Sequence, residues 1–225
     1  MDEQPTRKGY IGQAWLVILL SLVYGGALAG VETALRETIA ENKRRETYDR
    51  IPVLVPGADG DKTREVNQAD EVIVADADGN WQRVYLAVAA DGAPAGWVLP
   101  AGGQGFADRI DVLIGLDAQA STITGLYVLD QKETPGLGNF ITSEALFTNQ
   151  FAGKSADDPL TVVTTDPISG SHQIKAITGA TISSESVCRI VNRTLATFKQ
   201  PIRRRALQGG KATAQAPPGP GKDTQ

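Results

Sequence analysis

An uncharged, mostly apolar run near the amino terminus constrains this chain more than any other feature. No residue from Gly9 to Val31 is charged. As an α-helix this run would extend about 34 Å, against about 30 Å for the hydrocarbon core of a bilayer. Arg7 and Lys8 precede the run, and Trp15 lies near one end, where interfacial aromatic residues are common. The sequence therefore predicts one transmembrane helix over residues 9–31, with residues 1–8 in the cytoplasm.

A cleavable signal peptide is the alternative, since Ala27-Leu28-Ala29 resembles a cleavage site. Both interpretations export the rest of the chain. We favour the uncleaved anchor because the apolar character continues past the short core that a signal peptide needs. The basic residues after the run outnumber those before it and favour the opposite topology: Arg36, Lys43, Arg44 and Arg45. This count has less weight when a long domain follows the span.

Composition and charge narrow the class of protein. The 225 residues are 41% hydrophobic and 21% charged, as in an ordinary globular protein with one main domain. The net charge of −4, with no basic face along the chain, argues against a nucleic-acid partner. The single cysteine, Cys188, cannot form an internal disulfide or a thiolate metal site by itself. His172 is the only histidine and the adjacent Ser171 cannot complete a triad with it, so we expect no catalytic residue and no metal.

The remaining chain divides by composition. Residues 32–51 are rich in helix formers and should continue the anchor as a polar helical stalk until Pro52 stops it. Residues 52–207 are expected to form the folded domain on the extracytoplasmic side. Residues 208–225 are dominated by Gly, Pro, Gln and other small or polar residues, which predicts a disordered tail.

The pattern of β-branched and apolar residues predicts a strand region followed by helices. Expected strands are Glu71–Ala75, Arg83–Ala89, Gly96–Leu99, Asp111–Leu116, Thr122–Leu129 and Leu160–Thr164. Core candidates within them are Val72, Val74, Val84, Leu86, Val112, Ile114, Ile123, Leu126 and Val128. The segment Ala101–Gly105 is expected to be a turn or a mobile glycine loop.

Two helices are expected in this region, at Ser143–Phe151 and Ser184–Lys199. The second has an apolar stripe at helical spacing: Val187, Ile190, Val191, Thr194, Leu195 and Phe198. Strands that precede helices favour an α+β fold, with a bent, largely antiparallel sheet and packed helices after one transmembrane helix.

Two stretches do not look like simple packing. In Lys132-Glu133-Thr134-Pro135-Gly136-Leu137-Gly138, the Pro-Gly pair suits a type II turn, and Gly138 permits close approach of the backbone. A plain surface turn is the alternative, but it leaves Leu137 exposed between two glycines. Such a leucine is better explained if the loop closes over a flat apolar group.

The second stretch is Ile177-Thr178-Gly179-Ala180-Thr181-Ile182-Ser183-Ser184, directly before the amphipathic helix. Gly179 and Ala180 keep bulky side chains away from the backbone, while Thr178, Thr181, Ser183 and Ser184 offer hydroxyl groups. A helix amino terminus has free N–H groups and a partial positive charge, so it suits a phosphate. A simple helix cap with small neighbours remains the alternative.

Together the two motifs resemble the FMN-binding domain shared by the G subunit of Rnf electron-transport complexes and the C subunit of the sodium-translocating NADH:quinone reductase. The resemblance covers nearly the whole chain except the tail. It implies that FMN is linked through its phosphate to the hydroxyl of Thr181, a phosphoester threonine. It also implies that Glu133, Thr134, Pro135, Gly136, Leu137 and Gly138 approach the flavin ring, and that Thr178, Gly179, Ala180, Ser183 and Ser184 surround the phosphate and ribityl oxygens.

The resemblance also implies partners, location and function. The chain would carry electrons as a component of an Rnf-type ion-translocating ferredoxin:NAD oxidoreductase in the inner membrane, beside other membrane subunits. A flavin transferase would attach the flavin on the extracytoplasmic side. The family usually has an acidic residue where this chain has Lys175, a position associated with recognition by the transferase. A quinone-reductase C-type carrier, or a non-redox accessory or sensory flavin module, are the alternatives.

Overall fold

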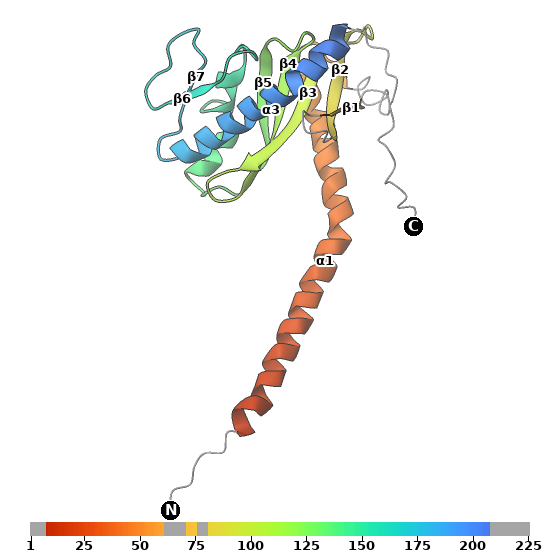
Figure 1. Cartoon of the computed structure of the whole chain (residues 1–225), viewed down its shortest axis with the longest axis vertical. Coiled ribbons are helices and arrows are strands. Elements are labelled where there is room, and N and C mark those ends of the chain that lie inside the picture. Colours follow the sequence, from red (N-terminus) through yellow and green to blue (C-terminus); the bar gives the residue numbers. More distant parts are fainter. Residues whose placement is uncertain (1–7, 61–70, 76–80, 208–225) are drawn as a thin grey trace, which may run out of the picture. The chain divides into compact units, whose positions relative to one another are not determined.

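The computed structural model describes residues 8–60, 71–75 and 81–207 (Figure 1). The chain forms two compact units, Met1–Arg45 and Glu46–Gln225. The expectations for residues 1–7 and 208–225 lie outside the described residues. Residues 46–51, which the sequence assigns to the stalk, belong to the second unit.

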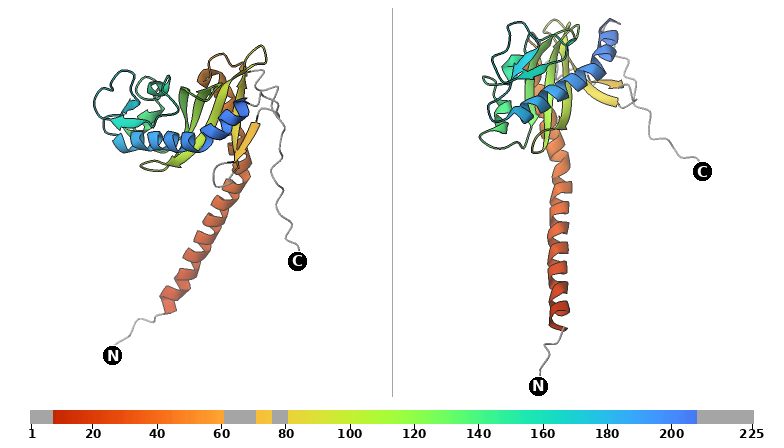
Figure 2. Two further views of the ribbon diagram at one scale, coloured as in Figure 1. Left: turned by 45° about the horizontal axis from the view of Figure 1, so that its top comes forward. Right: turned by 60° about the vertical axis from the view of Figure 1, so that its left-hand side comes forward.

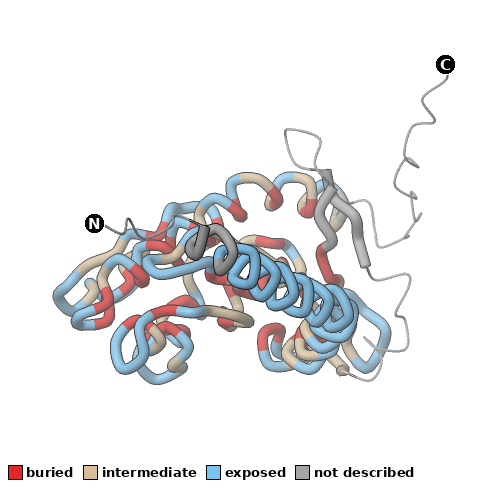
Figure 3. The backbone as a smooth tube through the Cα atoms, turned by 90° about the horizontal axis from the view of Figure 1, so that it is seen from below, coloured by how far each residue is buried: buried red, intermediate tan, exposed pale blue. Residues whose placement is uncertain are grey.

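The first unit contains most of helix α1, Lys8–Leu54. Within α1, Ala14–Leu54 is long and apolar enough to cross a membrane, and none of its most apolar window is buried inside the protein. Figure 3 shows α1 as exposed over most of its length, and residues 14–42 are all exposed. By length and composition, this apolar helix without protein packing around it fits the predicted membrane anchor.

Pro52 does not stop α1, contrary to the sequence-based expectation. The helix includes Pro52 in its last turn and ends at Leu54. Ile51 and Leu54 are buried, so packing in the second unit compensates for the hydrogen bond that proline cannot donate. The Thr124 hydroxyl then donates a hydrogen bond of 2.6 Å to the Leu54 carbonyl and satisfies one of the open groups at the helix end.

The second unit is built on a five-stranded antiparallel sheet in the order β1 to β5. Its strands are β1 Glu71–Ala75, β2 Trp81–Val88, β3 Pro94–Gln104, β4 Arg109–Asp117 and β5 Ile123–Asp130. The register shifts between Ala87 and Val88, Asp111 and Val112, and Gly115 and Leu116. Such irregularities bend strands and increase their twist. The predicted α+β fold with a bent, largely antiparallel sheet is therefore confirmed.

The glycine-rich segment Ala101–Gly105 is not a separate loop, and that prediction was wrong. β3 continues to Gln104, with Gly102 opposite Asp111 and Gly103 opposite Ile110. A Cβ atom on Gly103 would lie 2.7 Å from Ile190 Cγ1. The glycine therefore lets a helix approach the sheet closely, and strand pairing outweighs the local turn signal.

Side chains on the two faces of the sheet belong to two different hydrophobic cores. Trp97 and Leu99 belong to the larger core beneath helix α3, Thr181–Leu207. Val98 and Leu113 pack with the end of α1 on the opposite face. Figure 2 shows α3 lying along one face of the sheet in both views. The alternation along β3 and β4 explains how one sheet supports helices on both sides.

Most predicted core residues are confirmed. Val84, Val112, Ile114, Ile123, Leu126 and Val128 are buried, and Leu86 packs against them while partly exposed. The side chains of Val72 and Val74 lie outside the described residues. The predicted stripe of α3 is also buried along its length.

The expected α-helix at Ser143–Phe151 is not present. Residues 143–151 contain a turn followed by the short 3-10 helix η2 Thr148–Phe151, and another short 3-10 helix, η1 Gly138–Thr142, directly precedes them. Phe147 and Phe151 are fully buried and meet edge to face, with 5.3 Å between ring centroids. A nine-residue helix has little stability of its own, so the packing of these two rings sets the local backbone.

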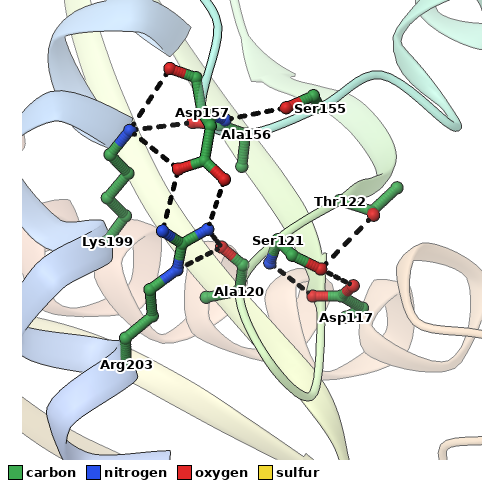
Figure 4. A network of polar contacts seen from close by, with 9 residues as sticks. All are labelled: Asp117, Ala120, Ser121, Thr122, Ser155, Ala156, Asp157, Lys199 and Arg203. Carbon is green, nitrogen blue, oxygen red and sulfur yellow. Dashed lines mark hydrogen bonds and ion pairs between the residues drawn. The ribbon is translucent and has the colours of Figure 1, made fainter.

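Helix α3 is longer than the predicted Ser184–Lys199 at both ends and includes Pro201. Beyond the proline, Arg203 forms two hydrogen bonds to Asp157, of 2.8 and 2.9 Å, and also donates to the Ala120 carbonyl (Figure 4). These contacts, with buried Ile202, hold the final turns in place. A small parallel pair, β6 Thr161–Val163 and β7 Gln173–Lys175, completes the fold, and β7 was not predicted.

Candidate functional site

The loop formed by Glu133–Gly138 has the turn that its sequence predicts. Gly136 has a φ of 76°, and the Leu137 N–H donates to the Thr134 carbonyl at 3.2 Å. Proline before a glycine with positive φ is the signature of a type II turn. Thr134 to Leu137 are exposed, whereas Glu133 and Gly138 are buried. The loop is therefore fixed at both ends and presents its centre to the surface.

The second motif forms the entrance to α3. Gly179 has a φ of 83°, which a residue with a side chain adopts only with strain. The Ala180 carbonyl accepts the first helical hydrogen bond, from the Ser184 N–H at 3.0 Å. The N–H groups of the first turn therefore face outward without helical partners. This is the arrangement that binds an anion such as phosphate.

The structure brings the two motifs together. A Cβ atom on Gly179 would lie 2.9 Å from Leu137 Cδ2, so the glycine makes room for the leucine. A Cβ atom on Gly138 would lie 2.9 Å from Glu133 Cβ and 3.0 Å from Ser183 Oγ. Both glycines are thus required for the two loops to approach each other closely, whether or not a ligand is bound.

A buried carboxylate joins these loops to a third segment. Glu133 Oε2 accepts a hydrogen bond of 2.6 Å from the Ser183 hydroxyl. Its Oε1 accepts from the backbone N–H groups of Phe106 and Ala107, at 3.0 and 3.1 Å. Sequence reasoning missed Phe106 and Ala107, because they donate through the backbone and a backbone donor has no residue signature. The glycine at position 105, before them, was the available signal.

The hydroxyl groups expected to surround the phosphate occupy different environments. Ser183 and Ser184 are buried, and the Ser184 hydroxyl donates to the Ala180 carbonyl and accepts from the Ile177 N–H. Thr178 is exposed, and Thr181 is half-buried. Within the described part of the chain the Thr181 hydroxyl has no hydrogen-bond partner, so it is the accessible hydroxyl on the helix itself.

A groove of about 1110 Å³ lies between α3 and the end of β3. Gly105 and Ile182 contribute to its lining close to the two loops, and Arg189 and Arg193 lie further along α3. The Arg189 guanidinium donates to the Ser186 hydroxyl at 2.7 Å. The groove therefore continues from the site along the helix and has a basic edge.

Cys188, His172 and Lys175, the other ionisable residues considered from the sequence, are each buried in the protein or paired with another side chain. Burial raises the pKa of the Cys188 thiol to about 12, with a smaller effect from Glu185, so the thiol is a packed apolar group. His172 Nε2 lies 3.3 Å from Asp158 Oδ2. Lys175 forms an ion pair with Asp166 and exchanges backbone hydrogen bonds with the Gln150 side chain. No group of three or more metal-ligating side chains occurs among the described residues.

The fold and the joined loops define the class of protein. Residues 105–196 match the FMN-binding domain family, and this range includes both loops, the buried carboxylate and most of α3. The match supports FMN as the ligand of this domain.

Relatives over nearly the whole chain identify the family more closely. The chain is 31% identical to the G subunit of the Na(+)-translocating ferredoxin:NAD(+) oxidoreductase complex of Acetobacterium woodii, over 82% of this chain and 89% of that protein. It is 32% identical to the G subunit of the ion-translocating oxidoreductase complex of Cereibacter sphaeroides, over 81% of each chain. The chain therefore belongs to the family of G subunits of ion-translocating oxidoreductase complexes.

A solved structure shows the same fold. The crystal structure of Shewanella oneidensis NqrC superposes with a TM-score of 0.54 at 24% identity, covering 58% of this chain and 63% of that one. At this identity the likeness concerns architecture alone. It agrees with the antiparallel sheet and the packed helix described above.

Proposed function

We propose that this chain is an electron-carrier subunit of a membrane-bound Rnf-type complex and holds FMN as a phosphoester on Thr181. The observation that carries the proposal is the position of the Thr181 hydroxyl. It is accessible and unpaired among the described residues, and it lies in the first turn of α3 beside the loop that contains Leu137. A phosphate there would meet free N–H groups and the positive end of the helix.

The residues present fit such a group. Gly179 and Ala180 leave space at the backbone, and exposed Thr178 can donate to phosphate oxygens. Leu137 offers an apolar surface for the flat ring, and Gly136 allows the turn that presents it. FMN supplies one- and two-electron redox chemistry when bound, and this chain fixes its position and surroundings. None of these residues needs to act as an acid, base or nucleophile towards a substrate.

Covalent attachment suits a carrier beside a membrane. A tether fixes the local concentration of the flavin by geometry instead of by supply. The candidate span within α1 would keep the domain at the membrane beside other subunits of the complex. We place the domain on the extracytoplasmic side of the inner membrane, where a flavin transferase would modify it. The ferredoxin:NAD reaction that names the Acetobacterium relative is proposed for the complex, with this chain as a carrier within it.

A direct experiment tests the attachment. The full chain is produced with its flavin transferase, and the denatured protein is examined for a fluorescent band under ultraviolet light. We expect a fluorescent wild-type band, a dark band for Thr181→Val, and a tryptic peptide containing Thr181 whose mass is increased by FMN. A fluorescent Thr181→Val band would exclude this residue as the attachment site.

One observation supports a second candidate, a non-redox accessory or sensory module. Lys175 replaces the acidic residue usual in the family and is exposed on β7, paired with Asp166. If this change prevents recognition by the transferase, the wild-type band is dark even when the transferase is active on another substrate. A quinone-reductase C-type carrier shares the fold, and the identity of the neighbouring subunits distinguishes it from the Rnf type.

A further inference from the structure

Three large apolar side chains around the two loops are exposed. Phe106 is 59% exposed, Ile182 is 53% exposed and Leu137 is 45% exposed. They come from the turn after β3, the first turn of α3 and the Glu133–Gly138 loop. We call these three side chains the apolar rim. Apolar groups that gather from separate segments at a ligand site indicate a surface to be covered.

The Glu133 carboxylate fixes the positions of all three segments. Only 4% of Glu133 is exposed, and its two oxygens accept three hydrogen bonds, from Phe106, Ala107 and Ser183. The Glu133 carboxylate therefore bridges the Phe106 N–H and the hydroxyl of Ser183, the residue after Ile182. Glu133 itself belongs to the loop that carries Leu137. One side chain thus determines how the apolar rim is arranged.

Glycines allow this arrangement. A Cβ atom on Gly105 would lie 2.3 Å from Glu133 Oε1, and one on Gly138 would lie 3.1 Å from Glu133 Oε2. Gly105 and Ile182 also line the same groove, which places the turn after β3 beside the first turn of α3. The carboxylate therefore lies between these two glycines, and its three hydrogen bonds are all to groups of the protein.

We propose that Phe106 is a further contact of the flavin ring, and that Glu133 is a positioning residue that holds Phe106 and Leu137 in place for that contact. This inference rests on the proposed attachment at Thr181, which directly precedes Ile182. A ring tethered there would start next to Ile182, which belongs to the apolar rim. The flat apolar ring and the phenyl group favour stacked or edge-to-face contact.

Substitution of Phe106 by tryptophan gives a positive signal for contact. Tryptophan quenches flavin fluorescence by electron transfer when the two rings touch. In the full, flavin-bearing chain, Phe106→Trp should lower native flavin fluorescence at least threefold relative to wild type, and denaturation should remove the difference. The matched control is Ile168→Trp, because Ile168 is an apolar residue of another loop with 68% exposure. Equal native fluorescence in the two variants would overturn the ring contact.

Variants of Glu133 test the positioning role. Combined with Phe106→Trp, Glu133→Ala should restore native fluorescence at least twofold, because the turn after β3 loses both hydrogen bonds. Glu133→Gln should preserve most of the quenching, since its amide oxygen can accept the same N–H bonds and its amide nitrogen can donate to Ser183. Unchanged quenching in Glu133→Ala would exclude the positioning role.

A milder variant decides the question if Glu133→Ala does not fold. Ser183→Ala, in the Phe106→Trp background, removes one of the three bonds and should restore part of the fluorescence. Full quenching in Ser183→Ala would then overturn the positioning role.

The fluorescence of the denatured protein band distinguishes failure of the attachment at Thr181 from failure of the ring contact with Phe106. A dark wild-type band overturns attachment and ring contact together, whereas a fluorescent band with unquenched Phe106→Trp overturns only the contact.

Discussion

Four hydroxyl groups lie within seven residues at the start of α3, and their surroundings differ. The Ser183 and Ser184 hydroxyls are buried and bonded to Glu133 and to the backbone. Modifying either would expel a buried polar group from its partners, which costs more than a hydrogen bond is worth. Thr178 is exposed but lies before the helix, whereas half-buried Thr181 lies on its first turn, where we propose that the phosphate is stabilised.

We therefore predict that the attachment site does not move. Thr181→Ser should keep a covalent flavin, since the hydroxyl remains at the same point of the helix. In Thr181→Val, neither Ser183 nor Ser184 should become modified, and Thr178→Val should retain the flavin on Thr181. Peptide mass spectrometry of the denatured variants measures each outcome. A flavin on Ser183 in Thr181→Val would show that the helix start, and not accessibility, determines the site.

The lone thiol leads to a second prediction at this scale. Burial raises the pKa of Cys188 to about 12, so at pH 8 the thiolate fraction is on the order of one in ten thousand. Only 3% of Cys188 is exposed, which also blocks reagents. Native protein should not react with a maleimide or a disulfide reagent at pH 8, and denatured protein should react with one equivalent. Rapid labelling of the native protein would show that this part of α3 opens easily.

At the scale of secondary structure elements, glycines determine how closely the helices pack on the sheet. Gly115 of β4 faces the end of α1, where a Cβ atom would lie 2.6 Å from the Leu54 carbonyl oxygen. Gly103 of β3 faces α3, where a Cβ atom would meet the Ile190 side chain. The first obstacle is backbone, held by the Thr124 hydroxyl, and the second is a side chain that can rotate.

The same substitution should therefore have different effects at the two positions. Gly115→Ala should lower the free energy of unfolding by about 1–3 kcal/mol, because backbone must move. Gly103→Ala should cost less than about 1 kcal/mol, because Ile190 can shift and alanine lowers the entropy of the unfolded chain. Urea unfolding of the full chain in detergent, followed by near-ultraviolet circular dichroism, measures both. Equal losses would contradict the distinction between backbone and side-chain obstacles.

The contacts of Asp157 attach the end of α3 to the loop before β6, and they predict a pH dependence. Hydrogen bonds from Arg203 lower the pKa of Asp157 from 3.8 to about 2, against a smaller opposing effect of burial and with further help from Lys199. A depressed pKa in the folded state means that the stabilisation is present above pH 4. It is lost as the pH falls towards 2. The carboxylate is half-exposed, so solvent screening limits the contribution to about 1 kcal/mol or less.

Asp157→Asn should therefore be up to about 1 kcal/mol less stable than wild type at pH 7. The difference should narrow as the pH is lowered from 4 to 2, because the wild-type carboxyl becomes protonated as well. Unfolding of the two proteins in urea at several pH values measures the difference directly. A constant difference across this range would show that the charge of Asp157 does not contribute.

Sequence patterns predicted those elements whose signal is local. The strands were predicted from alternating apolar residues and α3 from its apolar stripe at helical spacing. These patterns are reliable because each face of such an element has the same environment, core or solvent, along its length. Ala101–Gly105 was misread because glycine in a strand signals close packing only once the position of Ile190 is known. The 3-10 turns near Phe147 and the burial of Glu133 likewise depend on contacts between distant segments. The motif residues were identified, whereas the partners of Glu133 were not.

At the scale of the whole molecule, the anchor and the domain together determine which compartment contains the flavin. The uncharged run at residues 9–31 lies in the first unit. The two motif segments Glu133–Gly138 and Ile177–Ser184, here called the flavin loops, lie in the second unit. The basic residues after the span favour a cytoplasmic domain by a simple count. The length of the domain reduces the weight of that count, and we therefore predict that residues 52–207 lie outside the cytoplasm.

Single cysteine reporters test this topology, because the native Cys188 is buried and should not be labelled. Ile168→Cys places a thiol on an exposed loop of the second unit, and Asp2→Cys places one in the segment predicted to be cytoplasmic. In cells with an intact inner membrane, an impermeant maleimide should label Ile168→Cys, and it should label Asp2→Cys only after permeabilisation. The wild-type chain should remain unlabelled in both conditions. The reverse pattern would place the flavin loops in the cytoplasm, and attachment at Thr181 would then require a transferase in that compartment.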